Sequence, residues 1–291
     1  MEGHDTVIGS RFIALSLAGF ALFSTWGAQA EAGKQWTKIR IETEGAFRPW
    51  NFTNPDGTLG GFEIDLAKDL CARIKLECTI EAQAFDGAIP ALNAGKFDVI
   101  MSGMSVTPKR EEAILFSVPY GSTGQSFAVL KDGPLAKLPG KDNVYSLTSD
   151  EPGAIKALDE LKPTLKGKVI GVQSASIAAA FVEKYLKGVV EAREYKTTDQ
   201  HDLDLNAGRV DIIMASMAYL GGTIVKDGNK DMAIVGPRFQ GGVLGKGSAV
   251  GIRKTDPELK AMFDDAIKGA QADGTILKLS MKWFGFDVTP R

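Results

Sequence analysis

The chain has 291 residues, of which 44% are apolar and 24% are charged. That length and apolar content allow one large or two medium-sized domains with well-packed cores. The 34 basic and 36 acidic side chains leave a formal charge of −2. Because there is no basic surplus, the composition argues against binding to nucleic acid or to anionic membrane surfaces.

The first thirty residues have the pattern of a secretory signal. Arg11 precedes an apolar run over residues 12–23, and Ala28-Gln-Ala30 stands immediately before Glu31. The run is too short to span a bilayer, and Ala-x-Ala is a typical cleavage site. We therefore predict a cleaved signal peptide over residues 1–30 and a soluble, exported mature chain. Cleavage removes two acidic residues and one basic residue, so the formal charge moves from −2 to −1.

The extreme N-terminus departs from this pattern. Glu2 and Asp5 oppose the positive flank that usually precedes the apolar run of a signal peptide. Either translation begins near Val7 or the leader tolerates the acidic residues. His4 leaves with the leader, so His201 is the single histidine of the mature chain.

The mature chain carries two cysteines, Cys71 and Cys78. One lies near the end of an amphipathic helical segment, and the other opens an apolar stretch over residues 78–84. An even pair of cysteines in an exported protein favours a disulfide bond, here one that joins a helix to a strand. The alternative, a metal site, is weak because zinc takes three or four ligands and no histidine lies nearby.

Short strands and helices alternate in the first part of the mature chain. The first predicted strand is followed by the acidic residue Glu44, and two of the later helices are expected to begin at typical N-cap residues, Asp86 and Thr107. In chain order we predict a strand at 39–43, a turn at 54–57, a helix from 61, a helix through residue 92 with Asp86 as its N-cap, a strand at 98–101, and a helix capped by Thr107 with Pro108 at its first position.

A second series follows a segment rich in Gly, Ser and Thr at 121–124. It begins with a polar excursion over 131–168, and a further glycine-rich stretch covers 241–247. In chain order we predict an exposed helix near 154–161, a strand at 167–173, a helix at 177–185, a strand at 189–195, a strand at 248–253 and two helices near 258–273 and 276–283.

A fourteen-residue pattern occurs twice, at 92–105 and 205–218, with identical residues at eight positions. Each copy reads as the end of a helix, an Ala-Gly turn, an Asp, a buried strand and a loop of small residues. Chance is the alternative, since Ala-Gly-x-x-Asp before an apolar strand is common. A true repeat predicts one α/β layout built twice, with ligand received at the carboxyl ends of the strands.

These patterns predict an α/β protein with two lobes, in which the middle of the chain forms the second lobe and two crossings form a hinge. The predicted boundaries are 1–30 for the signal peptide, 31–121 for the first part of lobe 1, 122–125 for the hinge, 126–239 for lobe 2, 240–247 for the hinge return and 248–291 for the second part of lobe 1.

Nine short motifs, in the same order, resemble those of the family 3 periplasmic solute-binding proteins of ABC importers. They lie at 61–65, 85–90, 96–98, 105–110, 116–117, 171–173, 251–254, 273–275 and 282–285. Within that family the chain is most similar to the branch that binds basic amino acids and opines, including lysine, arginine, ornithine, histidine, octopine and nopaline. The segments at 145–147, 194–196 and 201–205 look closest to the octopine-binding members.

This resemblance implies a type II periplasmic-binding-protein fold, a periplasmic location and binding of a small ligand by lobe closure. It also implies docking on an inner-membrane permease that works with an ATPase, and we expect a monomer. No Gly-x-x-x-x-Gly-Lys-Ser/Thr loop is present, so we expect no ATP site and no cofactor on this chain.

Arg110 is the first candidate for ligand binding. It falls in the first turn of the helix capped by Thr107, where a cation is unfavourable unless it meets an anion. A ligand carboxylate would supply that anion in a bidentate pair, and the hydroxyls of Ser102 and Ser105 with nearby backbone amides, such as that of Gly103, would complete the shell. The alternative is a solvated surface arginine. The family resemblance places an arginine that binds the α-carboxylate at this position.

Glu44 follows the first strand beside Phe47 and Trp50. A carboxylate there suits a guanidinium or ammonium group of the ligand, and the family carries an acidic residue at this position in binders of basic ligands. Phe85 would form an apolar or cation-stacking wall for the ligand stem, or it would be an ordinary core residue.

The second lobe offers three further candidates. Gln173 and Ser176 lie at a strand-to-helix turn whose free amides favour an anionic group, although helix capping by Ser174 or Ser176 explains the same residues. Ser216 stands where amino-acid binders of this branch usually have an aspartate for the α-ammonium. A hydroxyl is a poorer partner for a primary ammonium, so we predict an opine-like, N-substituted ligand in preference to free arginine, lysine, ornithine or histidine.

The rival interpretation is an enzyme on the same scaffold, such as a periplasmic dehydratase. Such chemistry requires a positioned acid or base in the cleft. Glu44 is the one carboxylate that the sequence assigns there, and His201 is expected on a helix of lobe 2. We therefore predict a binding protein with no catalytic residues and no metal site.

Overall fold

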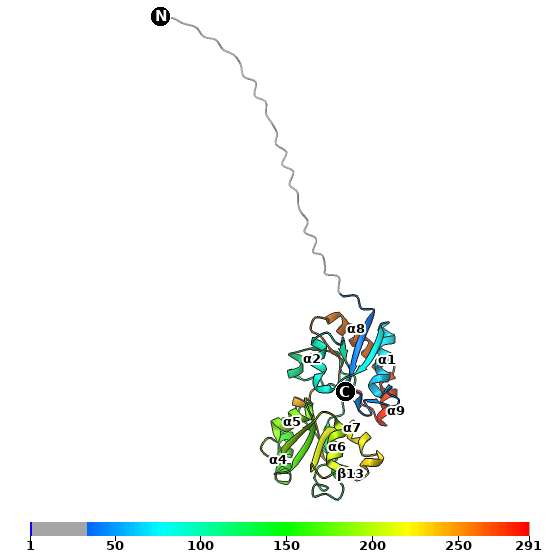
Figure 1. The fold of residues 1–291 in the computed structure, drawn as a ribbon. Coiled ribbons are helices and arrows are strands. Elements are labelled where there is room, and N and C mark those ends of the chain that lie inside the picture. Colours follow the sequence, from blue (N-terminus) through cyan, green and yellow to red (C-terminus); the bar gives the residue numbers. More distant parts are fainter. Residues whose placement is uncertain (2–33, 291) are drawn as a thin grey trace. The chain divides into compact units, whose positions relative to one another are not determined.

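The computed structural model describes residues 34–290 together with Met1. Residues 2–30 of the predicted signal peptide lie outside the described residues. Figure 1 shows the described chain as two groups of elements, one coloured blue, cyan and orange to red and the other green to yellow. None of the helices in this part has the length and hydropathy that a bilayer crossing requires.

The first lobe is built on a five-stranded sheet in the order β5-β1-β6-β14-β7. β1, β5 and β6 are parallel, and β14 runs antiparallel to its neighbours. The strands are β1 (Lys38–Thr43), β5 (Glu77–Ala82), β6 (Val99–Ile100), β7 (Leu115–Phe116) and β14 (Gly251–Ile252). The helices are α1 (Phe62–Ile74), η1 (Phe85–Gly87), α2 (Ala88–Asn93), α3 (Pro108–Glu111), α8 (Pro257–Ala272) and α9 (Thr275–Phe284).

The second lobe is built on a six-stranded sheet in the order β11-β10-β12-β8-β13-β9. β10 pairs in parallel with β11 and β12, whereas β8 is antiparallel to β12 and β13. The strands are β8 (Gln125–Leu130), β9 (Val144–Ser146), β10 (Val169–Gln173), β11 (Glu191–Tyr195), β12 (Ile212–Ser216) and β13 (Met232–Gln240). The helices are α4 (Glu151–Leu165), α5 (Ile177–Tyr185), α6 (Thr198–Asn206), α7 (Met217–Thr223), η2 (Asp227–Asn229) and η3 (Gly242–Leu244).

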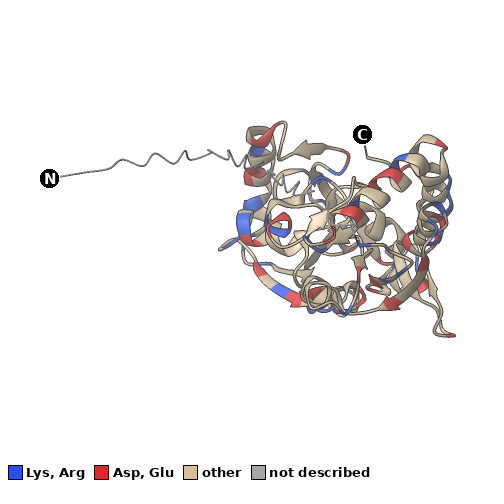
Figure 2. Cartoon of the chain, turned by 90° about the horizontal axis from the view of Figure 1, so that it is seen from above, with Lys and Arg blue, Asp and Glu red and all other residues tan. Residues whose placement is uncertain are grey.

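The two lobes have separate hydrophobic cores. In α8, Leu259, Phe263, Ala266, Ile267 and Ala270 are buried. This spacing places them on one face, which packs toward α1 and the lobe 1 sheet. Basic and acidic segments are interspersed over the ribbon in Figure 2, as the near-neutral composition predicts.

A small sheet of β2 (Ala46–Phe47), β3 (Asn51–Thr53) and β4 (Leu59–Gly60) lies between β1 and α1 in the chain. Gly61 joins it to α1 at φ 122°, and a Cβ atom there would lie 2.4 Å from the carbonyl oxygen of Trp50. Only glycine fits this approach, which fixes Trp50 beside the helix. The predicted Cys71–Cys78 disulfide bond is confirmed and joins α1 to β5.

The internal repeat is confirmed as helix, turn and strand in both copies. Gly95 and Gly208 adopt the left-handed conformation after α2 and α6. A carboxylate oxygen of Asp98 then accepts the backbone N–H of Arg40 at 2.9 Å, and one of Asp211 accepts that of Val169 at 2.8 Å. Each Asp therefore ties its own strand to the neighbouring parallel strand, which explains why the pattern needs this residue.

The chain passes between the two sheets twice, between β7 and β8 and between β13 and β14. The two passages contact each other at Gly121 and Ser248, where the N–H of Ser248 donates to the carbonyl of Gly121 at 2.7 Å. The two passages lie close together because the segment that forms lobe 2 is inserted into the sequence of lobe 1. The predicted role of these segments as a hinge stays a prediction.

Three predicted details were wrong. Asp86 is not an N-cap: it lies inside the 3-10 turn η1, and Gly87 precedes α2 without a side-chain cap. The strand expected over 248–253 is limited to Gly251–Ile252, because Ser248 forms isolated bridges with Ser105 and Gly121 instead. The helix predicted near 154–161 is present, but it is longer, Glu151–Leu165, and it is not simply exposed because its apolar face packs into the lobe 2 core.

Candidate ligand-binding site

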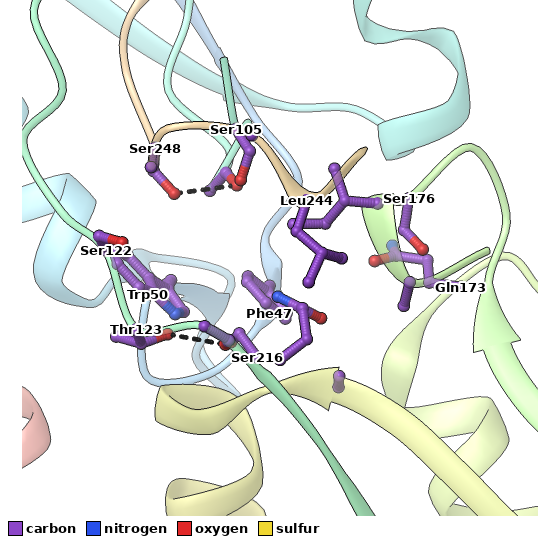
Figure 3. Close-up of a pocket in the computed structure, with 18 of the residues that line it drawn as sticks. Phe47, Trp50, Ser105, Ser122, Thr123, Gln173, Ser176, Ser216, Leu244 and Ser248 are labelled. Atoms are coloured by element: carbon purple, nitrogen blue, oxygen red, sulfur yellow. Dashed lines mark hydrogen bonds between the residues drawn. The ribbon is translucent and has the colours of Figure 1, made fainter. Parts of the chain in front are cut away.

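A pocket lies where the carboxyl ends of the parallel strands of both sheets face one another. β1, β6, β10 and β12 each lead directly into residues that line it. All ten predicted ligand-binding residues are among the lining residues: Glu44, Phe47, Phe85, Ser102, Gly103, Ser105, Arg110, Gln173, Ser176 and Ser216. Figure 3 shows Phe47 and Ser105 of lobe 1 and Gln173, Ser176 and Ser216 of lobe 2 around the same space.

Arg110 contributes the positive charge of the pocket. Thr107 caps α3 by accepting the backbone N–H of Arg110, and Pro108 occupies the first turn. The guanidinium donates to the carbonyl of Ser105 at 2.9 Å and, across the cleft, to that of Ala175 at 3.0 Å. No acidic side chain of residues 34–290 pairs with it in the structure. Burial lowers the pKa of Arg110 to about 10, because the cation loses water without gaining a counter-charge.

Glu44 contributes the acidic group of the pocket. It follows β1, is buried, and accepts a hydrogen bond from the side-chain amide of Gln173 in lobe 2 at 2.6 Å. Burial raises the pKa of Glu44 to about 8, against the effect of the Gln173 hydrogen bond, and the nearby acids Glu63, Asp199 and Asp86 add to the rise. Within the described chain, Glu44 and Arg110 are the only charged residues that line the pocket.

Aromatic rings form the walls. Phe85 lies beneath Arg110, with the guanidinium carbon 5.5 Å from the ring centroid. Phe47 stacks on Tyr219 of lobe 2 at 5.2 Å and an interplanar angle of 8°. Trp50 also lines the pocket, and its indole N–H has no hydrogen-bond partner among the described residues.

Two serines of lobe 2 combine capping with exposure to the pocket. Ser176 accepts the backbone N–H of Ala179 at 3.1 Å at the start of α5, and Ser216 accepts that of Tyr219 at 3.2 Å at the start of α7. A hydroxyl that accepts in this way keeps its own hydrogen to donate. Ser176 therefore caps α5 and also lines the pocket (Figure 3), and its predicted place beside an anionic group of the ligand stays a prediction.

Sequence reasoning missed the residues on the side of the pocket near the chain crossings. Trp50 was noted only as a neighbour of Glu44, and the segment at 121–124 only as a boundary. The structure adds Trp50, Ser122, Thr123, Gln125, Leu244 and Ser248 to the lining, as Figure 3 shows for five of them. The sequence feature that could have indicated them is the pair of hydroxyl residues Ser122 and Thr123 in a segment where the chain crosses between the lobes.

The lobes contact each other directly around the pocket. Besides the Glu44–Gln173 and Arg110–Ala175 hydrogen bonds, the hydroxyl of Thr198 donates to the carbonyl of Ala46 at 3.2 Å. The Phe47–Tyr219 stack adds an aromatic contact. The structure therefore has the two lobes closed on each other.

A second layer of buried acids lies behind the pocket in lobe 1. Glu63 accepts hydrogen bonds from Asn51 at 2.6 Å, from the backbone N–H of Gly103 at 2.6 Å and from the hydroxyl of Tyr120. Glu42 accepts one from Ser102 at 2.9 Å. Both carboxylates are fully buried, and sequence reasoning did not identify them.

His201 lies on α6, as predicted, and outside the pocket. Its ring is buried between Tyr195 and Tyr219, which meet it edge to face. Among the described residues, no group of three or more His, Cys, Asp or Glu side chains is arranged to hold a metal ion.

The sequence model of the bacterial extracellular solute-binding proteins, family 3, matches residues 39–286. The chain belongs to this family. The octopine-binding periplasmic protein of Rhizobium meliloti is 47% identical over 288 residues, which are 93% of this chain and 97% of that protein. The L-arginine-binding protein of Pseudomonas aeruginosa is 33% identical over 253 residues, covering 86% of this chain and 89% of that protein.

Solved structures of related binding proteins share the two-lobed fold. An ancestral arginine-binding protein bound to arginine has a TM-score of 0.72 and 30% identity, covering 87% of this chain and all of that one. An ancestral amino-acid-binding protein described as a precursor of cyclohexadienyl dehydratase has a TM-score of 0.67 and 28% identity, covering 85% of this chain and 95% of that one. The type II fold predicted for this family 3 solute-binding protein is thereby confirmed.

Proposed function

We propose that this solute-binding protein is the periplasmic component of an ABC importer for an opine of the octopine type. The observation that carries the proposal is the presence in one pocket of a cation, Arg110, and an acid, Glu44, which a bound ligand cation would ionise. Arg110 has no acidic partner among the described residues, and Glu44 is held by an uncharged amide. A ligand with a carboxylate at one end and a guanidinium or ammonium at the other satisfies both charges at once.

Ser216 favours an opine over a free amino acid. Its oxygen already accepts the N–H of Tyr219, so the hydroxyl offers the pocket a donor. A donor suits a carboxylate and gives no counter-charge to a primary ammonium. Opines carry a second carboxylate on a substituted amine. The 47% identity to an octopine-binding protein supports the same ligand class, and free arginine, lysine, ornithine or histidine is the alternative.

Binding by lobe closure explains how the protein signals that it is loaded. The cross-lobe contacts of Glu44, Phe47 and Arg110 all involve residues that line the pocket. A ligand that bridges these residues stabilises the closed form and shifts the population toward it. The closed monomer would then dock on the permease, with the crossings at 122–125 and 240–247 as the hinge.

We assign no reaction to the pocket. A dehydratase needs a free acid or base in contact with the substrate, whereas the carboxylate of Glu44 accepts the Gln173 amide and is suited to a ligand cation. The likeness to a dehydratase precursor is to a protein that is itself described as amino-acid-binding.

The test is calorimetry on mature protein that has been unfolded and refolded to remove bound solute. Octopine, nopaline, arginine, lysine, ornithine and histidine would each be titrated. We expect tight binding of an opine and weaker binding of the free amino acids. The reverse order would make the protein a component of a basic amino-acid importer, and turnover of any of these compounds would overturn the assignment as a binding protein.

A further inference from the structure

Glu42 is the least satisfied acidic group near the pocket. It lies on β1, and its side chain is 0% exposed. One carboxylate oxygen accepts the hydroxyl of Ser102 at 2.9 Å, and the other has no hydrogen-bond partner among the described residues. An ionised carboxylate buried with a single donor is costly, whereas a neutral carboxylic acid is not.

The acidic groups that face Glu42 further favour its neutral form over its ionised form. Glu44 lies two residues further along the chain, Glu63 approaches from α1, and Tyr120 lies beside Glu63. Among the described residues, Lys96 is the cation that acts on Glu42. Burial raises the pKa of Glu63 as well, but its three hydrogen-bond donors act in the opposite direction and favour the anion. Glu42 receives one donor, so a proton shared among these acids is best placed on Glu42.

The protonation of Glu42 decides what Ser102 offers the pocket. When Glu42 is ionised, it takes the hydroxyl hydrogen of Ser102, which then presents only lone pairs. When Glu42 is protonated on the oxygen nearest Ser102, it donates to the serine oxygen. The hydroxyl hydrogen of Ser102 is then free to donate to a ligand carboxylate, beside Arg110.

We propose that Glu42 is a positioning residue that holds a proton and turns the Ser102 hydroxyl toward the ligand, so that ligand binding depends on Glu42 remaining neutral. The inference rests on the proposed function, because it takes the ligand carboxylate to lie near Ser102 and Arg110. It adds a residue that lies behind the pocket and contacts no ligand itself.

The direction in which ligand affinity changes with pH distinguishes an effect of Glu42 from an effect of Glu44. A neutral Glu42 favours the ligand, so affinity falls as Glu42 loses its proton at rising pH. An ionised Glu44 favours the cationic end of the ligand, so affinity rises as Glu44 loses its proton. Burial raises the pKa of both groups to about 8, which places the opposed effects in the same pH range and predicts a maximum in affinity.

The experiment compares the wild type with Glu42→Gln by calorimetry with octopine between pH 6 and pH 9. Glutamine keeps the size of the neutral acid and offers an N–H donor to the Ser102 oxygen in place of the acid O–H, but it cannot ionise. We expect similar affinities below pH 7 and a wild type that weakens relative to the variant above pH 8, by at most tenfold per pH unit for one linked proton. The titration of the ligand itself cancels in this ratio.

A ratio of the two affinities that stays constant from pH 6 to pH 9 would overturn the proposal. If Glu42→Gln does not fold, Ser102→Ala serves instead, since it should also lack the weakening above pH 8. If octopine binds neither protein, the proposed function fails instead. Glu42 is then tested without ligand by carbon-13 NMR of glutamate carboxyl groups, where a resonance that titrates near pH 8 must disappear in Glu42→Gln.

Discussion

Replacing Arg110 by Met should remove ligand binding without destabilising the ligand-free protein. The substitution keeps an unbranched side chain of similar reach but deletes the charge. In the closed structure the guanidinium is partly desolvated and donates to two carbonyls, those of Ser105 and Ala175, with no acid beside it.

The magnitudes follow from that environment. Burial lowers the pKa of Arg110 to about 10, which corresponds to roughly 1–3 kcal/mol of unfavourable burial after allowance for solvent screening. In the ligand-free protein, in which the lobes open and the cross-lobe bond to Ala175 is absent, the one hydrogen bond to Ser105 offsets about 1.5–3 kcal/mol. We therefore expect the free energy of unfolding to change by less than about 1 kcal/mol. Loss of a charge-assisted bidentate pair with the ligand should weaken binding by about 3–5 kcal/mol, or at least a hundredfold.

Arg253 provides the matched control, since it is a paired arginine away from the pocket. Its guanidinium bonds Asp98 at 3.0 Å and Asp256 at 2.7 Å. Arg253→Met leaves two acids without this partner and should cost about 3–5 kcal/mol of stability. Urea denaturation and calorimetry on both variants make the comparison. A destabilised Arg110→Met that still binds ligand would refute the assignment of Arg110 as a ligand-binding residue.

Three further predictions test other parts of the structure. Replacing Cys71 and Cys78 by Ser should lower the free energy of unfolding in urea by about 2.5 kcal/mol, the value expected for a loop of this length; a loss below 1 kcal/mol would show that the helix–strand connection is held by packing alone. Thr198→Val should weaken ligand binding about two- to tenfold by removing the cross-lobe bond to Ala46, whereas Thr198→Ser should bind as the wild type does, and equal losses in both would assign the effect to packing. Burial raises the pKa of Glu42 in the folded protein from 4.5 to about 8, so the contribution of Glu42 to stability falls as the pH rises from 4.5 to 8. Glu42→Gln should therefore stabilise the ligand-free protein by up to about 4 kcal/mol at pH 8 and by little at pH 5. Curves of unfolding free energy against pH that run parallel for the two proteins would contradict this.

Local patterns in the sequence were enough to predict much of the fold. The Ala-Gly turn, the Asp and the apolar strand of the repeat occur in both lobes, because each Asp bonds the backbone of a neighbouring strand. Thr107 and Ser176 cap their helices as predicted. β8 was missed because Gln125–Leu130 is buried almost throughout and lacks the alternation that marks a half-buried strand.

The site was predictable where a strand ends in a polar residue. Glu44, Gln173 and Ser216 each stand at the end of a parallel strand, and they line the pocket. Trp50 and Ser248 reach the pocket through tertiary contacts between segments far apart in the chain, which no local pattern records. The same holds for the bond between Glu42 and Ser102, because a residue inside a strand gives no sign of what it faces.

The most direct test of the account is the ratio of octopine affinity to arginine affinity in the wild type and in Ser216→Asp, measured by calorimetry on refolded protein. Ser216→Thr keeps the hydroxyl and serves as the control. We predict that the wild type and Ser216→Thr prefer octopine and that the aspartate shifts the ratio toward arginine, by supplying a counter-charge for the primary ammonium. An unchanged ratio in Ser216→Asp would contradict the role given to Ser216 in selecting an opine.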